Sequence, residues 1–337
     1  MDKIILSIES SCDETACAII KNEELVANVV SSQIDTHQKY GGVMPEIASR
    51  LHLENIGCVI DDALKEANIK LEDVSAIAFT RGPGLIGALH VGLQAAKTLS
   101  LIYNIPLIPV HHLAAHIYAN EFVTPLKFPC LGVVVSGGNT ELVYMKNHLD
   151  FEIIGETKDD AVGESYDKVA RVLGLPYPGG VYIDKAAKEG KHTYKLPTPL
   201  HDGSLNFSYS GLKTAVINLV HKEKTNGNEI RIEDMAKSFQ DVAINVIIER
   251  VLKASTLYPI KQVVLAGGVS ANSYLRVEIK RVFEGSEIEV VIPPLWCTTD
   301  NAAMIAKLGS YLYERKAFAP LSVGVDPSWK LEDYNKF

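Results

Sequence analysis

Two histidines four residues apart are the most chemically informative pair in the sequence. His112 and His116 follow a short apolar run, and beyond that run the apolar residues take helical spacing. On a helix, residues at i and i+4 share one face, with Cβ atoms about 5–6 Å apart. Two imidazoles at this distance can bind one divalent ion and leave other positions for a carboxylate and a substrate oxygen. The chain has 10 histidines, so one such pair can also arise from composition alone.

An aspartate far along the chain is a candidate for the missing oxygen ligand. Asp300 lies beyond the last predicted strand and directly before a predicted helix. A side chain at that place can equally cap the free backbone N–H groups of the first helical turn. Periodicity does not choose between a metal ligand and a cap.

Three turns rich in small residues could hold a phosphate group. They span residues 10–15, 136–140 and 266–272, each after a predicted strand. Such turns bring backbone N–H groups close to a phosphate, and a following helix adds a favourable dipole. Each alone is a common tight turn, but three of them favour a phosphorylated ligand. None fits the P-loop or Gly-x-Gly-x-x-Gly pattern, so neither chemistry is indicated.

Two acids accompany these turns. Asp167 and Asp184 lie in segments that begin helices, the second of them one turn beyond a double glycine. They could accept hydrogen bonds from ribose hydroxyls, as acids do in other nucleotide-binding folds. The alternative is a carboxylate near a helix start, stabilised there by the helix dipole.

The elements that must position these residues recur in two halves of the chain. In each half, three strands joined by polar turns precede a helix, a strand and another helix, which indicates a weak internal duplication. This order predicts mostly parallel sheets covered on both faces, with a ligand in the crevice between two lobes. Strands are predicted at 4–9, 16–21, 25–32, 74–80, 105–110, 130–136, 141–146, 151–155, 262–265 and 287–292. Helices are predicted at 46–67, 85–103, 162–173, 183–189, 232–255, 271–283 and 301–314, and residues 33–44 as a loop.

Length and composition are those of a globular protein. The 337 residues suit two α/β lobes, and 47% apolar with 22% charged residues is ordinary for such proteins. No signal peptide is visible, and the apolar window 84–110 is broken by polar residues, so we expect no membrane span and a cytoplasmic location. The 5 cysteines include no Cys-x-x-Cys, which favours reduced thiols.

The charge distribution does not predict a nucleic-acid partner. Residues 1–75 carry 14 acidic and 6 basic side chains, which accounts for the whole net charge of −8. Binding to a nucleic acid would therefore need a local basic patch or another chain.

Eight segments, in order along nearly the whole chain, resemble one family: the tRNA N6-adenosine threonylcarbamoyltransferases, or TsaD family, formerly described as O-sialoglycoprotein endopeptidases. The segments are IESSCDET (8–15), HxxxH (112–116), VSGGNT (135–140), GESYDK (163–168), YPGG (177–180), FSxSGLK (207–213), GGVxAN (267–272) and TDNAAMIA (299–306). The resemblance implies an α/β fold of the actin/Hsp70-like ATPase (ASKHA) type, with two RNase H-like lobes and a nucleotide and metal cleft between them. We expect an N-terminal lobe at 1–128, a C-terminal lobe at 129–314 and a tail at 315–337 that packs back on the N-terminal lobe.

The resemblance also implies a set of ligands. A divalent metal, iron in the cell with zinc or another ion as a substitute, would be held by His112, His116 and Asp300. Contacts to the adenylate substrate would come from Val135, Ser136, Gly137, Gly138, Asn139, Asp167, Gly180, Asp184 and Asn272. One departure from the family pattern is Asn139, where many relatives have histidine; both side chains can donate to a ligand oxygen.

The implied reaction transfers the threonylcarbamoyl group of threonylcarbamoyl-adenylate to N6 of adenosine 37 in tRNAs that read codons starting with A, and releases AMP. That amine is a poor nucleophile because its lone pair is delocalised into the ring. Catalysis should therefore activate the carbamoyl group and stabilise departing AMP. Asp13 and Glu14 are candidate acceptors for the proton that leaves the amine. The resemblance implies as partners the tRNA anticodon loop, a paralogous TsaB-like subunit, a small TsaE-like ATPase and a separate synthase for the adenylate.

Three other functions compete with this prediction. A zincin-type metalloprotease needs His-Glu-x-x-His, and here the residue after His112 is Leu113, so the general base is absent. A metabolite kinase of the same fold needs no paired histidines, because its metal binds phosphates and carboxylates. A nucleotide-binding scaffold without activity is the third alternative.

Overall fold

The computed structural model describes residues 2–200 and 202–336, and its contacts divide the chain into two units. Unit 1 comprises residues 1–122 and 299–337, and unit 2 comprises residues 123–298. This division differs from the predicted lobes at two places: residues 123–128 belong to unit 2, and residues 299–314 belong to unit 1. The reason for the second difference is that helix α10 (Ala302–Glu314) covers the sheet of unit 1, although it follows the second lobe in sequence.

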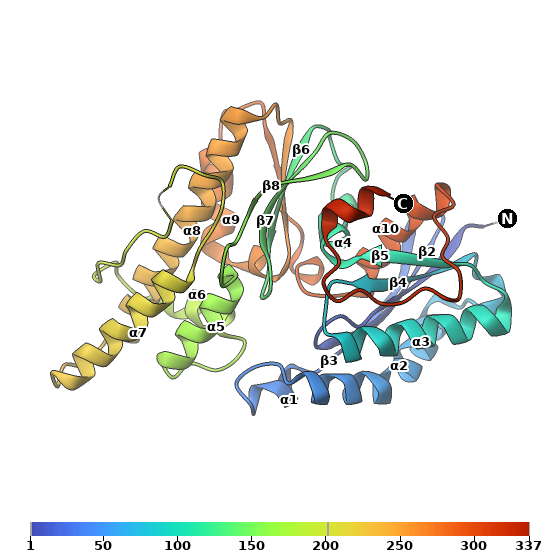
Figure 1. The fold of residues 1–337 in the computed structure, drawn as a ribbon, viewed down its shortest axis with the longest axis horizontal. Helices are drawn as coiled ribbons and strands as arrows, with labels where there is room; N and C mark the ends of the chain where they lie inside the picture. The colour runs from blue at the N-terminus through green and yellow to red at the C-terminus, as the bar shows by residue number, and fades with distance from the viewer. Residues whose placement is uncertain (1, 201, 337) are drawn as a thin grey trace. The chain divides into compact units, whose positions relative to one another are not determined.

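Unit 1 is built on a five-stranded sheet with strand order β3-β2-β1-β4-β5 (Figure 1). Strands β1, β2 and β3 pair antiparallel, whereas β4 and β5 extend the sheet in parallel. The strands are β1 (Ile4–Glu9), β2 (Glu14–Lys21), β3 (Glu24–Ser32), β4 (Ala76–Gly82) and β5 (Leu107–His111). The helices are α1 (Ile34–Gln38), α2 (Pro45–Ala67), α3 (Ile86–Tyr103), α4 (His112–Tyr118) and α10.

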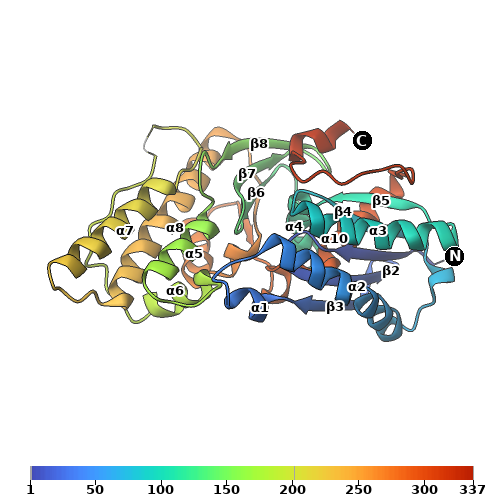
Figure 2. The same ribbon diagram turned by 60° about the horizontal axis from the view of Figure 1, so that its bottom comes forward.

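Different helices pack on the two faces of this sheet. Leu6 and Ile8 of β1 lie in one apolar cluster with residues of α2 and α3, which Figure 2 shows together on one side of the sheet. Ser7 points to the opposite face, where its Oγ donates to the backbone oxygen of Ala302 in α10 at 2.7 Å. Because side chains alternate along a strand, Glu9 shares the α10 face with Ser7.

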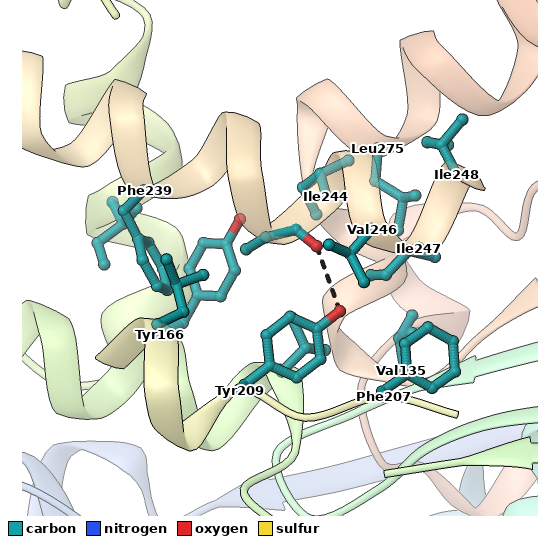
Figure 3. Packing of buried hydrophobic residues seen from close by; sticks show 14 of the residues in the cluster. Val135, Tyr166, Phe207, Tyr209, Phe239, Ile244, Val246, Ile247, Ile248 and Leu275 are labelled. Carbon is teal, nitrogen blue, oxygen red and sulfur yellow. Dashed lines mark hydrogen bonds between the residues drawn. The ribbon is translucent and has the colours of Figure 1, made fainter. Parts of the chain in front are cut away.

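Unit 2 repeats the same topology, with strand order β10-β9-β6-β7-β8. Its strands are β6 (Cys130–Val135), β7 (Thr140–Met145), β8 (Phe151–Glu156), β9 (Gln262–Ala266) and β10 (Glu289–Val291). Its helices are α5 (Val162–Val172), α6 (Gly179–Ala187), α7 (Ser210–Thr225), α8 (Ile232–Leu257) and α9 (Ser273–Val282). The core gathers around α8, where Figure 3 shows Tyr166, Phe207 and Tyr209 among aliphatic side chains. The hydroxyl of Tyr209 donates to the backbone oxygen of Ala243 at 3.2 Å (Figure 3).

The prediction of mostly parallel sheets is wrong. Each sheet has two antiparallel and two parallel strand pairs. The physical reason is the short turns between the first three strands of each unit, because a hairpin joins only antiparallel strands and a parallel pair needs a long crossover.

Two helices were not predicted. α1 lies within the expected loop 33–44, and its five residues are too few to show a period; the buried side chain of His37 contacts Gln33 at 3.1 Å. α7 buries only a narrow stripe, namely Leu212, Val216 and Val220, amid polar residues.

The C-terminal tail lies on unit 1. The amide of Ala319 donates to the oxygen of Leu107, and Nε2 of His111 to the backbone oxygen of Trp329, both at 2.9 Å. The ring of Trp329 also packs on His111, with centroids 5.1 Å apart. The tail therefore fixes the end of β5, directly before His112. Within the described ranges, no helix combines the length and apolarity that crossing a bilayer would require.

Candidate metal centre and phosphate-binding turns

Local structure brings the three predicted metal ligands to one place in unit 1. β5 ends at His111 and α4 begins at His112, so one helical turn places His112 and His116 on the same face. Asp300 lies just before α10, whose N-cap is Asn301. Oδ1 of Asn301 accepts from the amide of Met304 at 3.1 Å. Asp300 is therefore not the cap, and its carboxylate is left to face the histidines.

The donor atoms converge on Asp300. Its Oδ1 lies 3.0 Å from Nε2 of His116 and 3.4 Å from Nε2 of His112. The two imidazole rings are 4.7 Å apart between centroids and nearly perpendicular, at 86°. Both histidines are buried, and the Asp300 side chain is 21% exposed. The open side of the group is thus at the carboxylate.

This donor set fits a divalent ion. One ligand atom from each of the three residues lies within 4.8 Å of the others. Ligands about 2 Å from a shared ion are separated by roughly 3–4 Å, so small side-chain movements complete the geometry. Two imidazoles and one carboxylate leave a further position for water or substrate, which is typical of catalytic rather than structural sites.

Charges within the group explain its pKa shifts. Burial would lower the pKa of His112, but the carboxylates of Asp300 and Glu9 raise it well above its usual range. Burial would likewise raise the pKa of Asp300, but His112 and His116 hold it far below its usual value. A metal-ligating imidazole must be neutral, so ion binding here would release a proton.

Both candidate bases lie at the turn between β1 and β2. Asp13 and Glu14 are buried, and His52 of α2 holds the turn: its Nε2 donates to the oxygen of Cys12 at 2.9 Å, and its Nδ1 lies 2.8 Å from the Thr15 hydroxyl. Burial first, and then the neighbouring charge of Asp13, raise the pKa of Glu14 well above its ordinary value. Glu14 therefore retains a proton to higher pH than an exposed glutamate.

In unit 2, the small-residue turns pack directly against one another. A Cβ on Gly163, at the start of α5, would lie 2.5 Å from the oxygen of Ser136, and one on Gly267 would lie 2.6 Å from the oxygen of Val135. Gly267 also has φ of +86°, which favours glycine. Gly137 and Gly138 are exposed, with open space around their Cβ positions. The turn after β6 is thus packed against Gly163 and Gly267 on one side, and its Gly137 and Gly138 are exposed on the other.

Two of the predicted adenylate contacts are joined by a residue that was not predicted. Gln240 of α8 is buried; its amide nitrogen donates to Asp184 at 3.2 Å, and its oxygen accepts from Asn272 at 2.8 Å. Asn272 also caps α9 by accepting from the amide of Leu275. Asp184 accepts from the hydroxyl of Ser273 at 2.8 Å. Asp184 and Asn272 thus form one network at the start of α9.

The remaining predicted contacts have simpler surroundings. Asp167 lies within α5 and accepts from the amide of Gly179 at 2.7 Å, which ties α5 to the start of α6 beside Gly180. Neither Asp167 nor Asp184 occupies the first turn of its helix, so the helix-dipole alternative does not describe them. The amide of Asn139 donates to the hydroxyl of Ser136 at 3.1 Å and closes the turn.

Comparison with known proteins decides the family. The sequence profile of TsaD, tRNA N6-adenosine threonylcarbamoyltransferase, matches residues 24–307. The chain belongs to the TsaD family. It is 55% identical over 332 residues to the tRNA N6-adenosine threonylcarbamoyltransferase of Bacillus thuringiensis strain Al Hakam, covering 98% of this chain and 97% of the relative. It is 53% identical over 336 residues to that of Bacillus subtilis strain 168, covering 99% and 97%.

Solved structures with low sequence identity share the fold of this TsaD-family chain. Full-length HypF, in its phosphate- and nucleotide-bound form, aligns with a TM-score of 0.62 at 16% identity, over 94% of this chain and 47% of HypF. Component A of the Acidaminococcus fermentans (R)-2-hydroxyglutaryl-CoA dehydratase aligns with a TM-score of 0.53 at 18% identity, over 94% and 99%. The predicted two-lobed α/β fold of the actin/Hsp70-like ATPase type is confirmed.

Proposed function

We propose that the chain transfers the threonylcarbamoyl group from threonylcarbamoyl-adenylate to N6 of adenosine 37 in tRNA, and releases AMP. The observation that carries the proposal is 55% identity, over 98% of the chain, to a relative named for this transfer. The convergent histidines and aspartate of unit 1 and the open glycine turn of unit 2 supply the chemical groups that the reaction needs. The work would take place in the cytoplasm, where tRNA is available.

The metal would be held by Nε2 of His112, Nε2 of His116 and Asp300, and we propose iron, with zinc or another divalent ion as a functional substitute. When bound, such an ion supplies Lewis-acid polarisation of a carbonyl or neutralisation of phosphate charge. The Nε2 atoms of both histidines lie close to one carboxylate oxygen, and burial of the two imidazoles excludes bulk water from two of the three ligands.

The adenylate would bind to unit 2. Backbone N–H groups of the turn that contains Gly137 and Gly138 would donate to the phosphate, since no side chain blocks their approach. Asp184, Asp167 and Asn272 would accept from or donate to the nucleoside, with Gly180 allowing close approach at the start of α6. Each of these three side chains already has a protein partner, which fixes its rotamer before the ligand arrives.

A proton must leave the attacking amine, and we propose Glu14, with Asp13 as its hydrogen-bonded neighbour, as the acceptor. The raised pKa of Glu14 makes it a stronger base once it is deprotonated. Partners would be the tRNA anticodon loop, a TsaB-like paralogue, a TsaE-like ATPase and the synthase that makes the adenylate. Unit 1, with 20 acidic and 13 basic side chains, would not attract tRNA by net charge, which fits an enzyme that needs a helper chain.

The test is a transfer assay with the purified chain, its partner proteins, tRNA without the modification, and adenylate made from labelled threonine. We expect label in the tRNA, located at adenosine 37 by nuclease digestion and mass spectrometry. A tRNA with guanosine at that position is the control and should take up no label. Absence of transfer with a partner set that is active with a relative would overturn the proposal.

A kinase of the same fold remains the second candidate, because HypF was solved with nucleotide and phosphate bound. It predicts ATP-dependent phosphorylation of a small molecule and no label in tRNA. The same incubation with γ-labelled ATP separates the two activities.

A further inference from the structure

A fully buried glutamate stands behind one of the two histidines. Glu9, the last residue of β1, has no exposed surface. Its Oε2 lies 3.2 Å from Nδ1 of His112 and accepts a hydrogen bond from the hydroxyl of Thr80 at 2.5 Å. Its Oε1 accepts from the backbone amide of Ser11, also at 2.5 Å. The carboxylate therefore has a partner on each oxygen and touches the ring nitrogen of His112 that faces away from Asp300.

The geometry of the imidazole assigns a role to this contact. The other ring nitrogen of His112, Nε2, points to Asp300, where the donor atoms converge. A neutral imidazole carries one N–H and one lone pair, and the hydrogen bond made by one nitrogen decides which nitrogen is left to bind a metal. A carboxylate can only accept a hydrogen bond. Glu9 therefore favours the tautomer with the proton on Nδ1 and the lone pair on Nε2.

Charge compensation supports the same assignment. An isolated buried carboxylate is costly unless positive charge lies nearby, and Thr80 and the Ser11 amide are neutral donors. Asp300 contacts both histidines, but His112 is the one imidazole that lies between the two carboxylates. A divalent ion on Nε2 supplies the charge that two carboxylates on opposite sides of one imidazole require.

We propose that Glu9 is a positioning residue of the metal centre: it holds His112 in the Nδ1–H tautomer and orientation that present Nε2 to the ion. The inference rests on the proposed metal site and extends it from the ligands to the group behind one of them. Carboxylates in this position raise the basicity of the ligating histidine, and removing them typically weakens metal binding about 10–100-fold.

The second histidine provides an internal comparison. Nδ1 of His116 is buried and has no hydrogen-bond partner among the residues that the structure describes. Within that part of the chain, His116 therefore has no acceptor behind its ring, and its one contact is on the metal side, where Nε2 lies 3.0 Å from Asp300. In the described ranges, only His112 has a carboxylate on the nitrogen that faces away from the metal site. The two ligands share a helix and a metal but differ in what stands behind them, so removing Glu9 should affect the ring of His112 and leave that of His116 unchanged.

The experiment uses the full chain and Zn²⁺ alone as the probe. Zinc affinity is measured by competition with a chelator for the unaltered protein, Glu9→Gln and the control Ser11→Ala. Ser11 is a matched control because its hydroxyl lies at the same 3.2 Å from Nδ1 of His112. We expect a loss of about 10–100-fold for Glu9→Gln and less than about threefold for Ser11→Ala. Unchanged affinity in Glu9→Gln, or an equal loss in Ser11→Ala, would overturn the assignment to Glu9.

A second readout reports the tautomer directly. In zinc-loaded, ¹⁵N-histidine-labelled protein, in which a ligating imidazole must be neutral, long-range ¹H–¹⁵N spectra assign the protonated nitrogen of each ring. We expect Nδ1–H for His112 in the unaltered protein and a mixed tautomer in Glu9→Gln, with His116 unaffected. Weaker zinc binding with an unchanged His112 tautomer would also contradict the proposal, since Glu9 would then act elsewhere. If Glu9→Gln does not fold, Glu9→Asp, which withdraws the carboxylate by one methylene, is measured instead.

These outcomes separate this inference from the proposed function. If the unaltered protein binds no zinc, the metal site itself fails and the role of Glu9 fails with it. If the unaltered protein binds zinc and Glu9→Gln binds it equally well, only the role of Glu9 is rejected.

Discussion

The turn that follows β1 and the turn that follows β6 occupy matching places in two sheets of the same topology. In unit 1 the turn is buried: Ser10, Ser11 and Asp13 are each less than 10% exposed, and charged groups surround them. In unit 2 the turn exposes Gly137 and Gly138 and carries no charged side chain. One topology thus presents two kinds of chemistry.

The difference shows what each half contributes. A carboxylate and two imidazoles around a buried turn favour a cation, whereas uncharged backbone N–H groups on an open turn favour an anion. The strand order determines where a turn lies, and the side chains in and around it determine what it can bind. The predictions below test this division, from the largest expected effect to the smallest.

The largest effect is expected from removing a metal ligand in unit 1. His112→Ala or Asp300→Ala should abolish stoichiometric metal binding and transfer activity, because two remaining ligands hold a divalent ion weakly. Metal content is measured by emission spectrometry after anaerobic purification. His90→Ala, an exposed histidine of α3, is the control and should retain full metal. Unchanged metal content in both ligand variants would show that these residues are not the site.

The next effect concerns Glu14 as proton acceptor. Because burial and Asp13 raise its pKa, the carboxylate form becomes populated only as pH rises, so kcat/KM should increase with pH across that range. Glu14→Gln should lose about 10²–10⁴-fold and lose this pH dependence. Asp13→Asn is the comparison. If the fall of kcat/KM at low pH disappears in Asp13→Asn and persists in Glu14→Gln, Asp13 is the proton acceptor instead of Glu14. Circular dichroism checks that both variants are folded.

A third prediction contrasts two glycines of unit 2. Gly163→Ala places a Cβ 2.5 Å from the oxygen of Ser136, so we expect a loss of about 1–3 kcal/mol in the free energy of unfolding. Gly138→Ala meets open space and should change stability by less than about 0.5 kcal/mol. It should instead weaken binding of the adenylate on the order of tenfold, because the added Cβ hinders the close approach of the phosphate to the backbone N–H groups and weakens about one hydrogen bond. Urea denaturation measures the free energy of unfolding, and calorimetry with a non-hydrolysable adenylate analogue measures the binding affinity. Equal stability for the two variants would contradict the packing argument.

The smallest effect, on the free energy of unfolding, is expected from an ion cluster of unit 2. Asp160 lies 2.5 Å from Lys213 and 3.2 Å from Lys168. Burial would raise its pKa, but the two lysines lower it. A lowered folded-state pKa means that the stabilisation is present at neutral pH and is lost as pH falls below about 4. Asp160→Asn should therefore cost about 0.5–1 kcal/mol at pH 7, and the cost should shrink as pH falls from about 4 through the lowered folded-state pKa. A pH-independent difference would show that the hydrogen bonds, and not the charge, matter.

The sequence predicts local features of this molecule far better than distant ones. Strands such as β1 and the i,i+4 histidines follow from spacing within a few residues, and their elements are found at nearly the expected bounds. Asp300 is 184 residues from His116, so only the family resemblance linked them. α10 was placed in the wrong half because nothing in its apolar pattern specifies which sheet it covers.

Two positions escaped prediction for a different reason. Glu9 at a strand end and Gln240 within a long helix look like surface polar residues, and only the fold buries them. For Glu9, one signal was available: all other residues of β1 except Ser7 are apolar, so its side chain had to enter a covered face.

The return of the chain to unit 1 through α10 has a consequence for biosynthesis. A ribosome releases the two histidines early but delivers Asp300 only after all of unit 2 has been made. Until then the nascent sheet lacks the cover that Ala302 and Ala303 provide, and any ion would have only two protein ligands. An ion at the proposed metal centre would therefore acquire its third protein ligand only after nearly the whole polypeptide has been translated.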